Sequence, residues 1–181
     1  MKRFKIKLGI QTLQTLLVCV ALSLICAGCN AKVPKKSASM YEMIDSVMRT
    51  EIGDSLCSIM LEAKRIDAER INLINDSIAV LSSKKMSTAN TAITKFLFAS
   101  YENYSDAGKA FGKFSPSVRL KFSKKRKACY VYFDFSLQLL VIKNANDEEL
   151  KRCLLTNKDF LKLANLLFPN DEFLKFILNN K

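Results

Sequence analysis

The residues best suited to chemistry form one short basic segment. Residues 113–127 contain seven lysines and arginines and no acidic residue. Beyond them come Tyr130 and Tyr132, which strand alternation places on the face opposite Val131 and Phe133. Basic groups beside exposed aromatic rings can bind nucleic acid or other anionic surfaces. The candidate anion-binding residues are Arg119, Lys121, Lys124, Lys125, Arg126 and Lys127.

The same segment also has a purely structural explanation. Lysines at the tip of a β-hairpin keep the turn solvated, and lysines along a sheet edge prevent another chain from pairing with it. From the sequence alone, both interpretations stay open.

Groups that could catalyse a reaction are few. The chain contains no histidine, which excludes Ser-His-Asp and Cys-His catalysis and histidine-ligated zinc. Gly108 and Gly112 are isolated, and neither belongs to a phosphate-binding loop. As nucleophiles, Cys57, Cys129 and Cys153 would need a base that no nearby motif supplies. We therefore expect no enzymatic activity, no cofactor and no metal site.

One acidic residue, Asp134, lies in an apolar and aromatic run and could act as a general acid. Glycoside hydrolysis needs two carboxylates, however, and the next acidic residues, 147–149, come after another expected strand. A hydrogen bond within a turn is the simpler role for Asp134. Cys57, Cys129 and Cys153 can all be small core residues, although Cys129 and Cys153 could also form a disulfide.

The amino-terminal segment has the three parts of an export signal. Residues 2–7 supply four basic side chains and no acid, and residues 8–25 are uncharged and mostly apolar. The small residues Ala27 and Gly28 then precede Cys29. This ending resembles the lipobox of bacterial lipoproteins, in which a peptidase cuts before a cysteine that carries a diacylglycerol.

The resemblance implies that residues 1–28 are a signal peptide and that Cys29 is the lipidated first residue of the mature protein. Cys26 stands where the family prefers Leu, Val or Ile. One alternative is an uncleaved membrane helix, for which an apolar run of about 18 residues is short. The other is cleavage near Gly28 without lipidation, which would give a soluble secreted product.

Residues 29–39 are expected to form the lipidated cysteine and a polar tether. Pro34 and the surrounding lysines and serines argue against packing. Fully extended, the tether would reach about 30 Å, which would hold the folded part near the membrane. Asn30 and Ala31 follow Cys29 and do not resemble the acid-rich tether that serves as a surface-export signal in some bacterial lipoproteins, so the resemblance to that family implies a position facing the periplasm.

The net positive charge of the chain indicates which classes of partner to expect. Four of the 29 basic residues and none of the 17 acidic residues lie in residues 1–28, so the remaining chain has a net charge of +8. Besides the membrane that holds the anchor, anionic lipids, glycans and acidic protein surfaces are the expected partners. Nucleic acid is not expected, because an exported protein rarely meets it.

The sequence thus predicts a membrane-anchored bacterial lipoprotein of the cell envelope with a non-catalytic binding or structural role. One alternative is an envelope enzyme, either a wall hydrolase or a thiol protein. Another is an inhibitor or immunity lipoprotein that binds an acidic partner through a protruding lysine-rich hairpin.

Residues 40–181 predict a single α+β domain. Apolar residues recur at steps of three and four up to residue 81, which is typical of a helix face. We expect helices over residues 39–52 and 54–82, interrupted at Gly53, and another over residues 88–104.

The period then changes to two, which predicts a small antiparallel sheet. Residues 117–123 and 129–134 are expected to pair as a hairpin around the basic turn at residues 124–127. Residues 137–142 are apolar and could form a third strand or continue a bent second one.

The carboxyl-terminal part is expected to be helical. Residues 147–155 could form a short helix, Thr156 or Asn157 could cap the next one, and Pro169 would end it. A last helix is expected to start at Asn170 or Asp171. The order of elements from residue 114 to residue 169 also resembles a loosely defined module of uncharacterised bacterial lipoproteins, which implies no activity.

Overall fold

The computed structural model describes residues 46–108 and 112–180. The expected signal peptide, Cys29 and the tether lie outside the described residues. Within the described ranges, no helix is both long and apolar enough to cross a membrane.

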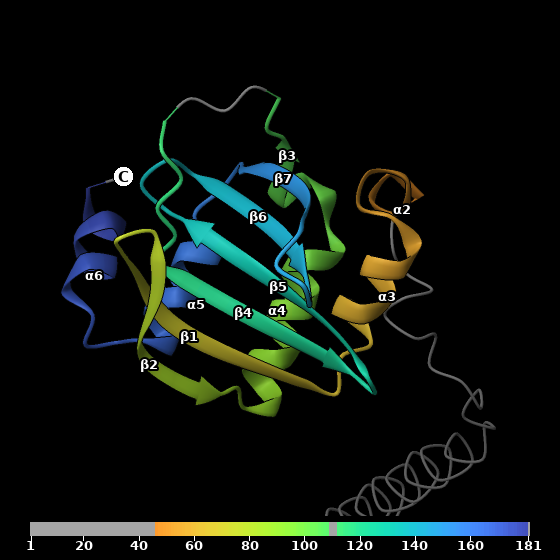
Figure 1. Ribbon diagram of the computed structural model, residues 1–181, viewed down its shortest axis with the longest axis horizontal. Coiled ribbons are helices and arrows are strands. Elements are labelled where there is room, and N and C mark those ends of the chain that lie inside the picture. Colours follow the sequence, from red (N-terminus) through yellow and green to blue (C-terminus); the bar gives the residue numbers. More distant parts are fainter. Residues whose placement is uncertain (1–45, 109–111, 181) are drawn as a thin grey trace, which may run out of the picture. The chain divides into compact units, whose positions relative to one another are not determined.

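The described chain is built on one antiparallel sheet of seven strands in the order β2-β1-β4-β5-β6-β7-β3 (Figure 1). Its strands are β1 (Arg65–Ile74), β2 (Ser77–Lys85), β3 (Tyr104–Asp106), β4 (Val118–Lys124), β5 (Lys127–Asp134), β6 (Leu139–Asn144) and β7 (Glu149–Leu155). Its helices are α2 (Ser46–Ile52), α3 (Asp54–Leu61), α4 (Thr88–Ala99), α5 (Asp159–Leu167) and α6 (Glu172–Asn179), with a short 3₁₀ turn at Tyr101–Asn103. The predicted α+β class with helices at both ends is confirmed, but the sheet is larger than predicted.

The main core lies between the sheet and the helices on one of its faces; Figure 1 shows α4 and α5 behind the strands. Phe98 of α4 is at its centre, with its ring 5.3 Å from that of Phe122 on β4 and 4.9 Å from that of Phe160 on α5. Each such aromatic pair adds about 1 kcal/mol beyond simple burial. The aromatic cluster therefore joins both helices to the centre of the sheet.

The sequence predicted the start and end of α5 and the start of α6. The end of α5 and the start of α6 are confirmed, and the start of α5 differs by one residue. The Asn157 side chain accepts a hydrogen bond from Asp159 N (3.0 Å) in the first turn of α5, although the cap position itself is Lys158. Helix α5 ends just before Pro169. The Asp171 side chain caps α6 by accepting from the amide of Leu174 at 2.9 Å.

The predicted helix over residues 54–82 is wrong after its first two turns. Helix α3 ends at Leu61, and the rest of the segment forms the β1–β2 hairpin. Asn75 and Asp76 both have positive φ (50° and 59°), as a tight hairpin turn requires. The apolar spacing is compatible with a helix, but the many β-branched residues favour strands once a partner strand is available.

Two further helix predictions are wrong in part. The helix predicted over residues 88–104 ends at Ala99, and Tyr104–Asp106 forms the short edge strand β3. Residues 147–155 are not helical: β7 pairs with β6 and buries Cys153 and Leu155 on alternate positions. Strand pairing replaces the helix in both segments, because β7 pairs with its neighbour β6 on one side and with the distant β3 on the other.

The central prediction is confirmed: β4 and β5 form the expected hairpin, and β6 is the third strand. The tight turn is at Lys125 and Arg126, so the strands extend one or two residues further into the basic run than predicted. The turn projects at the lower right of Figure 1, at the end of the sheet away from α6.

Candidate functional site

The basic segment is divided by the fold into two environments. Arg119 and Lys121 lie within β4, on the face opposite the main core. Lys124 ends β4, Lys125 and Arg126 form the turn, and Lys127 opens β5 opposite Lys124. The six predicted residues therefore do not form one continuous surface.

Arg119 is occupied by contacts within the sheet. Its guanidinium lies 2.5 Å from the Glu69 carboxylate on β1 and 3.4 Å from the Tyr132 hydroxyl on β5. It also lies over the rings of Tyr130 and Tyr132, 5.4 and 5.7 Å from their centroids. Burial alone would lower the pKa of Arg119, but its bonds to Tyr132 and Glu69 raise it. Arg119 therefore joins three strands and has little capacity left for a ligand.

The predicted pair of exposed tyrosines is wrong for Tyr132. Only 2 % of Tyr132 is exposed, because it packs with Ile71 and Val141 in a small cluster on the face opposite the main core. Its hydroxyl lies 3.2 Å from Asp147, and Lys143 Nζ lies 5.2 Å from its ring centroid. A stacking platform that includes Tyr132 is therefore absent from the described structure.

Lys124 is held by helix α3. Its ammonium donates to the Glu62 carboxylate just beyond the end of α3 and to the Ser58 hydroxyl on the helix. Hydrogen bonds from Lys124 and Ser58 lower the pKa of Glu62. These contacts fix the hairpin end against α3 and neutralise one of its four cations.

The remaining three basic residues of the turn border an open cavity. This tip cavity has a volume of about 530 Å³ and lies between α3 and the hairpin turn. Its lining residues are Ser55, Ser58, Ile59, Lys124, Lys125, Arg126 and Lys127. Lys125, Arg126 and Lys127 are exposed, and none of them forms an ion pair with a described residue. Three cations at this site are therefore available to an anion.

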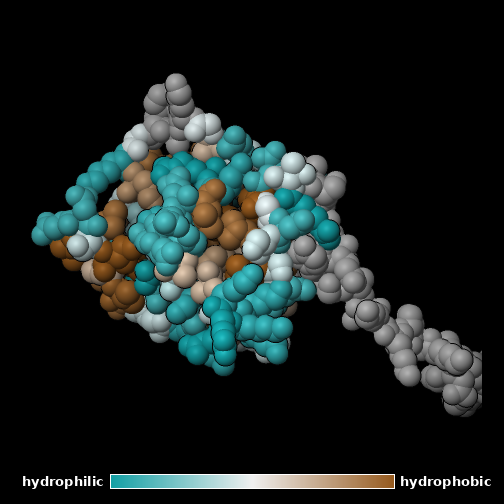
Figure 2. All heavy atoms as spheres, turned by 45° about the vertical axis from the view of Figure 1, so that its right-hand side comes forward, coloured by the Kyte–Doolittle hydropathy of each residue, from teal (hydrophilic) through white to brown (hydrophobic). Residues whose placement is uncertain are grey.

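The side of the molecule that carries α2 and α3 comes forward in Figure 2. Hydrophilic side chains cover most of this view, with apolar atoms visible between them. The sequence predicted the basic residues that line the hairpin side of the tip cavity, but not the serine and isoleucine residues that line its α3 side. No sequence signal linked the two, because Ser58 and Lys124 are 66 residues apart and meet only through the fold.

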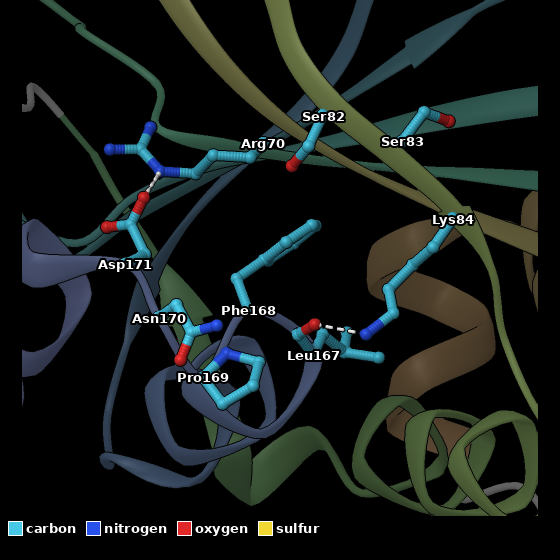
Figure 3. Close-up of a pocket in the computed structure, with 9 residues that line it drawn as sticks. All are labelled: Arg70, Ser82, Ser83, Lys84, Leu167, Phe168, Pro169, Asn170 and Asp171. Carbon is cyan, nitrogen blue, oxygen red and sulfur yellow. Dashed lines mark hydrogen bonds and ion pairs between the residues drawn. The ribbon is translucent and has the colours of Figure 1, made fainter.

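A second cavity, of about 380 Å³, lies between β1–β2 and the loop that joins α5 to α6 (Figure 3). Arg70 binds the Asp171 carboxylate at 2.7 Å and donates to the Ser117 carbonyl at 2.8 Å. Lys84 donates to the Leu167 carbonyl and lies 5.8 Å from the Phe168 ring centroid. Both cations thus hold the β1–β2 hairpin against the segment that joins α5 to α6. We therefore assign this cavity a structural role.

The candidate acid Asp134 is also occupied. Only 1 % of it is exposed, and its two oxygens accept from the amides of Ser115 (2.7 Å), Ser136 (3.0 Å) and Leu137 (3.0 Å). The turn role predicted from the sequence is confirmed, and the carboxylate also holds the loop that leads into β4.

The three described cysteines are buried and free, so Cys129 and Cys153 do not form a disulfide. Burial raises the thiol pKa to about 11 for Cys57, about 12 for Cys129 and about 11 for Cys153. Thiols in this state are poor nucleophiles. Within the described ranges, no group of three cysteine or acidic side chains is arranged to hold a metal ion.

The tip cavity thus combines serine hydroxyls and accessible space with three cations that form no ion pair with a described residue, whereas the two cations of the second cavity are already engaged. No protein-family model, curated protein or solved structure gives a significant match to this chain.

Proposed function

We propose that this chain is a lipid-anchored protein of the bacterial cell envelope that binds anionic groups, without catalysis, at the tip of the β4–β5 hairpin. The anchor is the lipobox-like ending at Cys29, and the polar tether after it would keep the folded domain facing the periplasm. The observation that carries the binding proposal is the group of three cations beside the tip cavity that form no ion pair within residues 46–108 and 112–180.

Charge at the tip favours binding over a purely protective role for the lysines. An edge-protecting charge needs only water around it, whereas this turn is packed against α3 and encloses space beside two serine hydroxyls. The hairpin turn lies at the end of β4 and β5, and both outer edges of the sheet, β2 and β3, lie elsewhere. Protection of an exposed edge therefore does not account for its charge.

The state of the nucleophilic and acidic groups favours a non-catalytic role over an envelope hydrolase or thiol enzyme. The described thiols are buried with raised pKa, and Asp134 already accepts three backbone hydrogen bonds. An inhibitor that uses the hairpin to contact an acidic protein remains the second candidate, since the same three exposed cations suit it.

The anchor is tested by intact mass and membrane fractionation of the native protein and of Cys29→Ala. We expect a mass equal to residues 29–181 plus acyl chains, recovery in the membrane fraction, and no processing of the variant. A mass that retains residues 1–28 without lipid would instead support an uncleaved helix.

Anion binding is tested by the salt concentration that releases the detergent-purified full chain from a phosphate-bearing matrix. The tip variant carries Lys125→Gln, Arg126→Gln and Lys127→Gln. The matched variant removes the same charge from α5 and α6, with Lys158→Gln, Lys162→Gln and Lys175→Gln. We expect the tip variant to elute at clearly lower salt than the matched variant. Equal elution would mean that net charge alone causes retention and would refute a binding role for the tip.

A further inference from the structure

The tip cavity has features of a discrete site rather than a diffuse charged surface. One wall comes from α3, and the other comes from the hairpin turn. Lys124 is fixed between them by Glu62 and Ser58, so the two walls are held in register. A volume of about 530 Å³ is within the range of small-ligand sites.

The charge balance of the cavity favours a dianion. Glu62 pairs with Lys124 and also lies in the field of Lys125, and among the described residues Lys125, Arg126 and Lys127 form no ion pair of their own. A guanidinium binds two oxygens of a phosphate at once, and ammonium groups act as point charges around it. The hydroxyl of Ser55, on the first turn of α3, adds a neutral donor at the same cavity. These groups suit a phosphate monoester better than a singly charged carboxylate or phosphodiester.

The cavity also has an apolar side. Ile59 contributes to its lining, and the methylene stems of the lysines extend the apolar contact beneath their charged ends. A free inorganic ion would leave this side unused. The ligand that fits both parts carries a phosphate group next to an apolar moiety.

Resting on the function proposed above, we infer that the tip cavity binds a phosphate monoester attached to an apolar group, in a one-to-one complex. Lys125, Arg126, Lys127 and Ser55 contact the phosphate, and Ile59 contacts the apolar part. The ligand can be the headgroup of a membrane amphiphile or a soluble phosphorylated compound, because the recognised chemistry is the same. Nucleic acid is disfavoured because, of the two tyrosines that could have stacked on bases, Tyr132 is buried and the Tyr130 ring already lies under the Arg119 guanidinium.

Calorimetric titration of the detergent-purified full chain separates these ligands. The probes are dihexanoyl phosphatidic acid, which has a phosphate monoester and apolar chains, dihexanoyl phosphatidylglycerol, which is a diester, and glycerol 3-phosphate, which lacks the chains. We expect one-to-one binding of the first probe, with at least about tenfold weaker binding of the other two. Equal affinity for the first and third probes would refute the apolar part of the inference, and equal affinity for the monoester and the diester would refute recognition of a phosphate monoester.

Variants link the binding to the cavity. We expect the tip variant to lose at least about tenfold in affinity for dihexanoyl phosphatidic acid and Ser55→Ala to lose about threefold. The matched variant on α5 and α6 should bind as the native protein does, and because it shares the same micelles it also corrects for partition of the probe into detergent. An equal loss in the matched variant would refute a discrete site.

The pH dependence gives an independent readout. The charged groups around the cavity are Asp54 and Glu62 on the α3 side and lysine and arginine on the hairpin side, and the chain contains no histidine. Phosphate monoesters take up their second negative charge between about pH 5.5 and 7.5. Affinity should therefore rise about fivefold from pH 5.5 to 7.5, and a flat profile would contradict dianion recognition.

Failure of this inference is distinguishable from failure of the proposed function. If the tip variant elutes early from the matrix but calorimetry detects no stoichiometric binding of the monoester, only the discrete phosphate site is refuted. If neither experiment separates the tip variant from the matched variant, both proposals are wrong.

Discussion

The charged residues at the base of the β4–β5 hairpin are buried or partly buried and compensated by partners, whereas those in its turn are exposed. At the base, Asp134 accepts three backbone amides and Arg119 is paired with Glu69. At the tip, Lys125, Arg126 and Lys127 are exposed and without ion pairs to described residues. A buried charge destabilises the fold unless an opposite charge or hydrogen bonds compensate for its lost hydration. An exposed charge keeps its hydration, so it can stay unpaired with little loss of stability and is accessible to a ligand. The base therefore serves stability and the tip is free to serve binding.

The largest effect should come from the base of the hairpin. Asp134→Ala removes the acceptor of three amide groups in a buried position, and we expect a loss of about 3 kcal/mol in the free energy of unfolding. Chemical denaturation followed by circular dichroism measures it. Asp134→Asn keeps one acceptor oxygen and should lose about half as much. A loss below about 1 kcal/mol for the alanine variant would mean that water replaces the carboxylate and that the base is less dependent on this charge.

A smaller effect is expected from the ion pair within the strands. Arg119→Ala leaves Glu69 unpaired at a position where its side chain is 17 % exposed, and this should cost about 2 kcal/mol. The double variant Arg119→Leu with Glu69→Leu should recover most of that loss, since it leaves no unpaired charge.

Lys125 in the turn is the control for Arg119, because it is a basic residue of the same hairpin that is exposed to solvent. Lys125→Ala should change the free energy of unfolding by less than about 0.5 kcal/mol, because its ammonium forms no ion pair with any residue that the structure describes. Similar losses for Arg119→Ala and Lys125→Ala, measured by the same denaturation, would remove the distinction between base and tip.

A small effect is also expected from the contact between Lys124 at the hairpin tip and Glu62 beside α3. Because hydrogen bonds from Lys124 and Ser58 lower the pKa of Glu62 in the folded state, this carboxylate stabilises the fold above its unfolded pKa. The stabilisation, about 0.5 kcal/mol for a pair of this exposure, is lost as the pH falls through the lowered folded pKa. We therefore expect native protein and Glu62→Gln to differ in melting temperature at pH 7 and to converge towards pH 3. A difference that grows on acidification would reverse the assigned sign.

Local chemistry made much of the fold predictable. Alternation of apolar and polar residues predicted the strands of the β4–β5 hairpin, and the apolar run after it predicted β6. Asp171 caps α6 as its side chain and position suggested. These features depend on neighbours within a few residues, so they can be inferred without knowing the rest of the fold.

The segment from residue 62 to residue 85 could not be inferred in this way. Its isoleucines are spaced so that either a helix or a twisted hairpin can bury some of them, and the turn residues Asn75 and Asp76 were the available signal for a hairpin. The choice was made by β4, which pairs with β1 along six residues. Strand pairing of this kind depends on a partner distant in the chain and is invisible to a local pattern.

The candidate site shows the same division. The sequence by itself determined the run of basic residues, the alternation that exposes them on one hairpin, and the absence of histidine. Only the tertiary structure decided which charges remain free, because Glu69 neutralises Arg119 across 50 residues and Glu62 neutralises Lys124 across 62. Charge compensation acts over a few ångströms in space, and the sequence does not record which distant residues come that close.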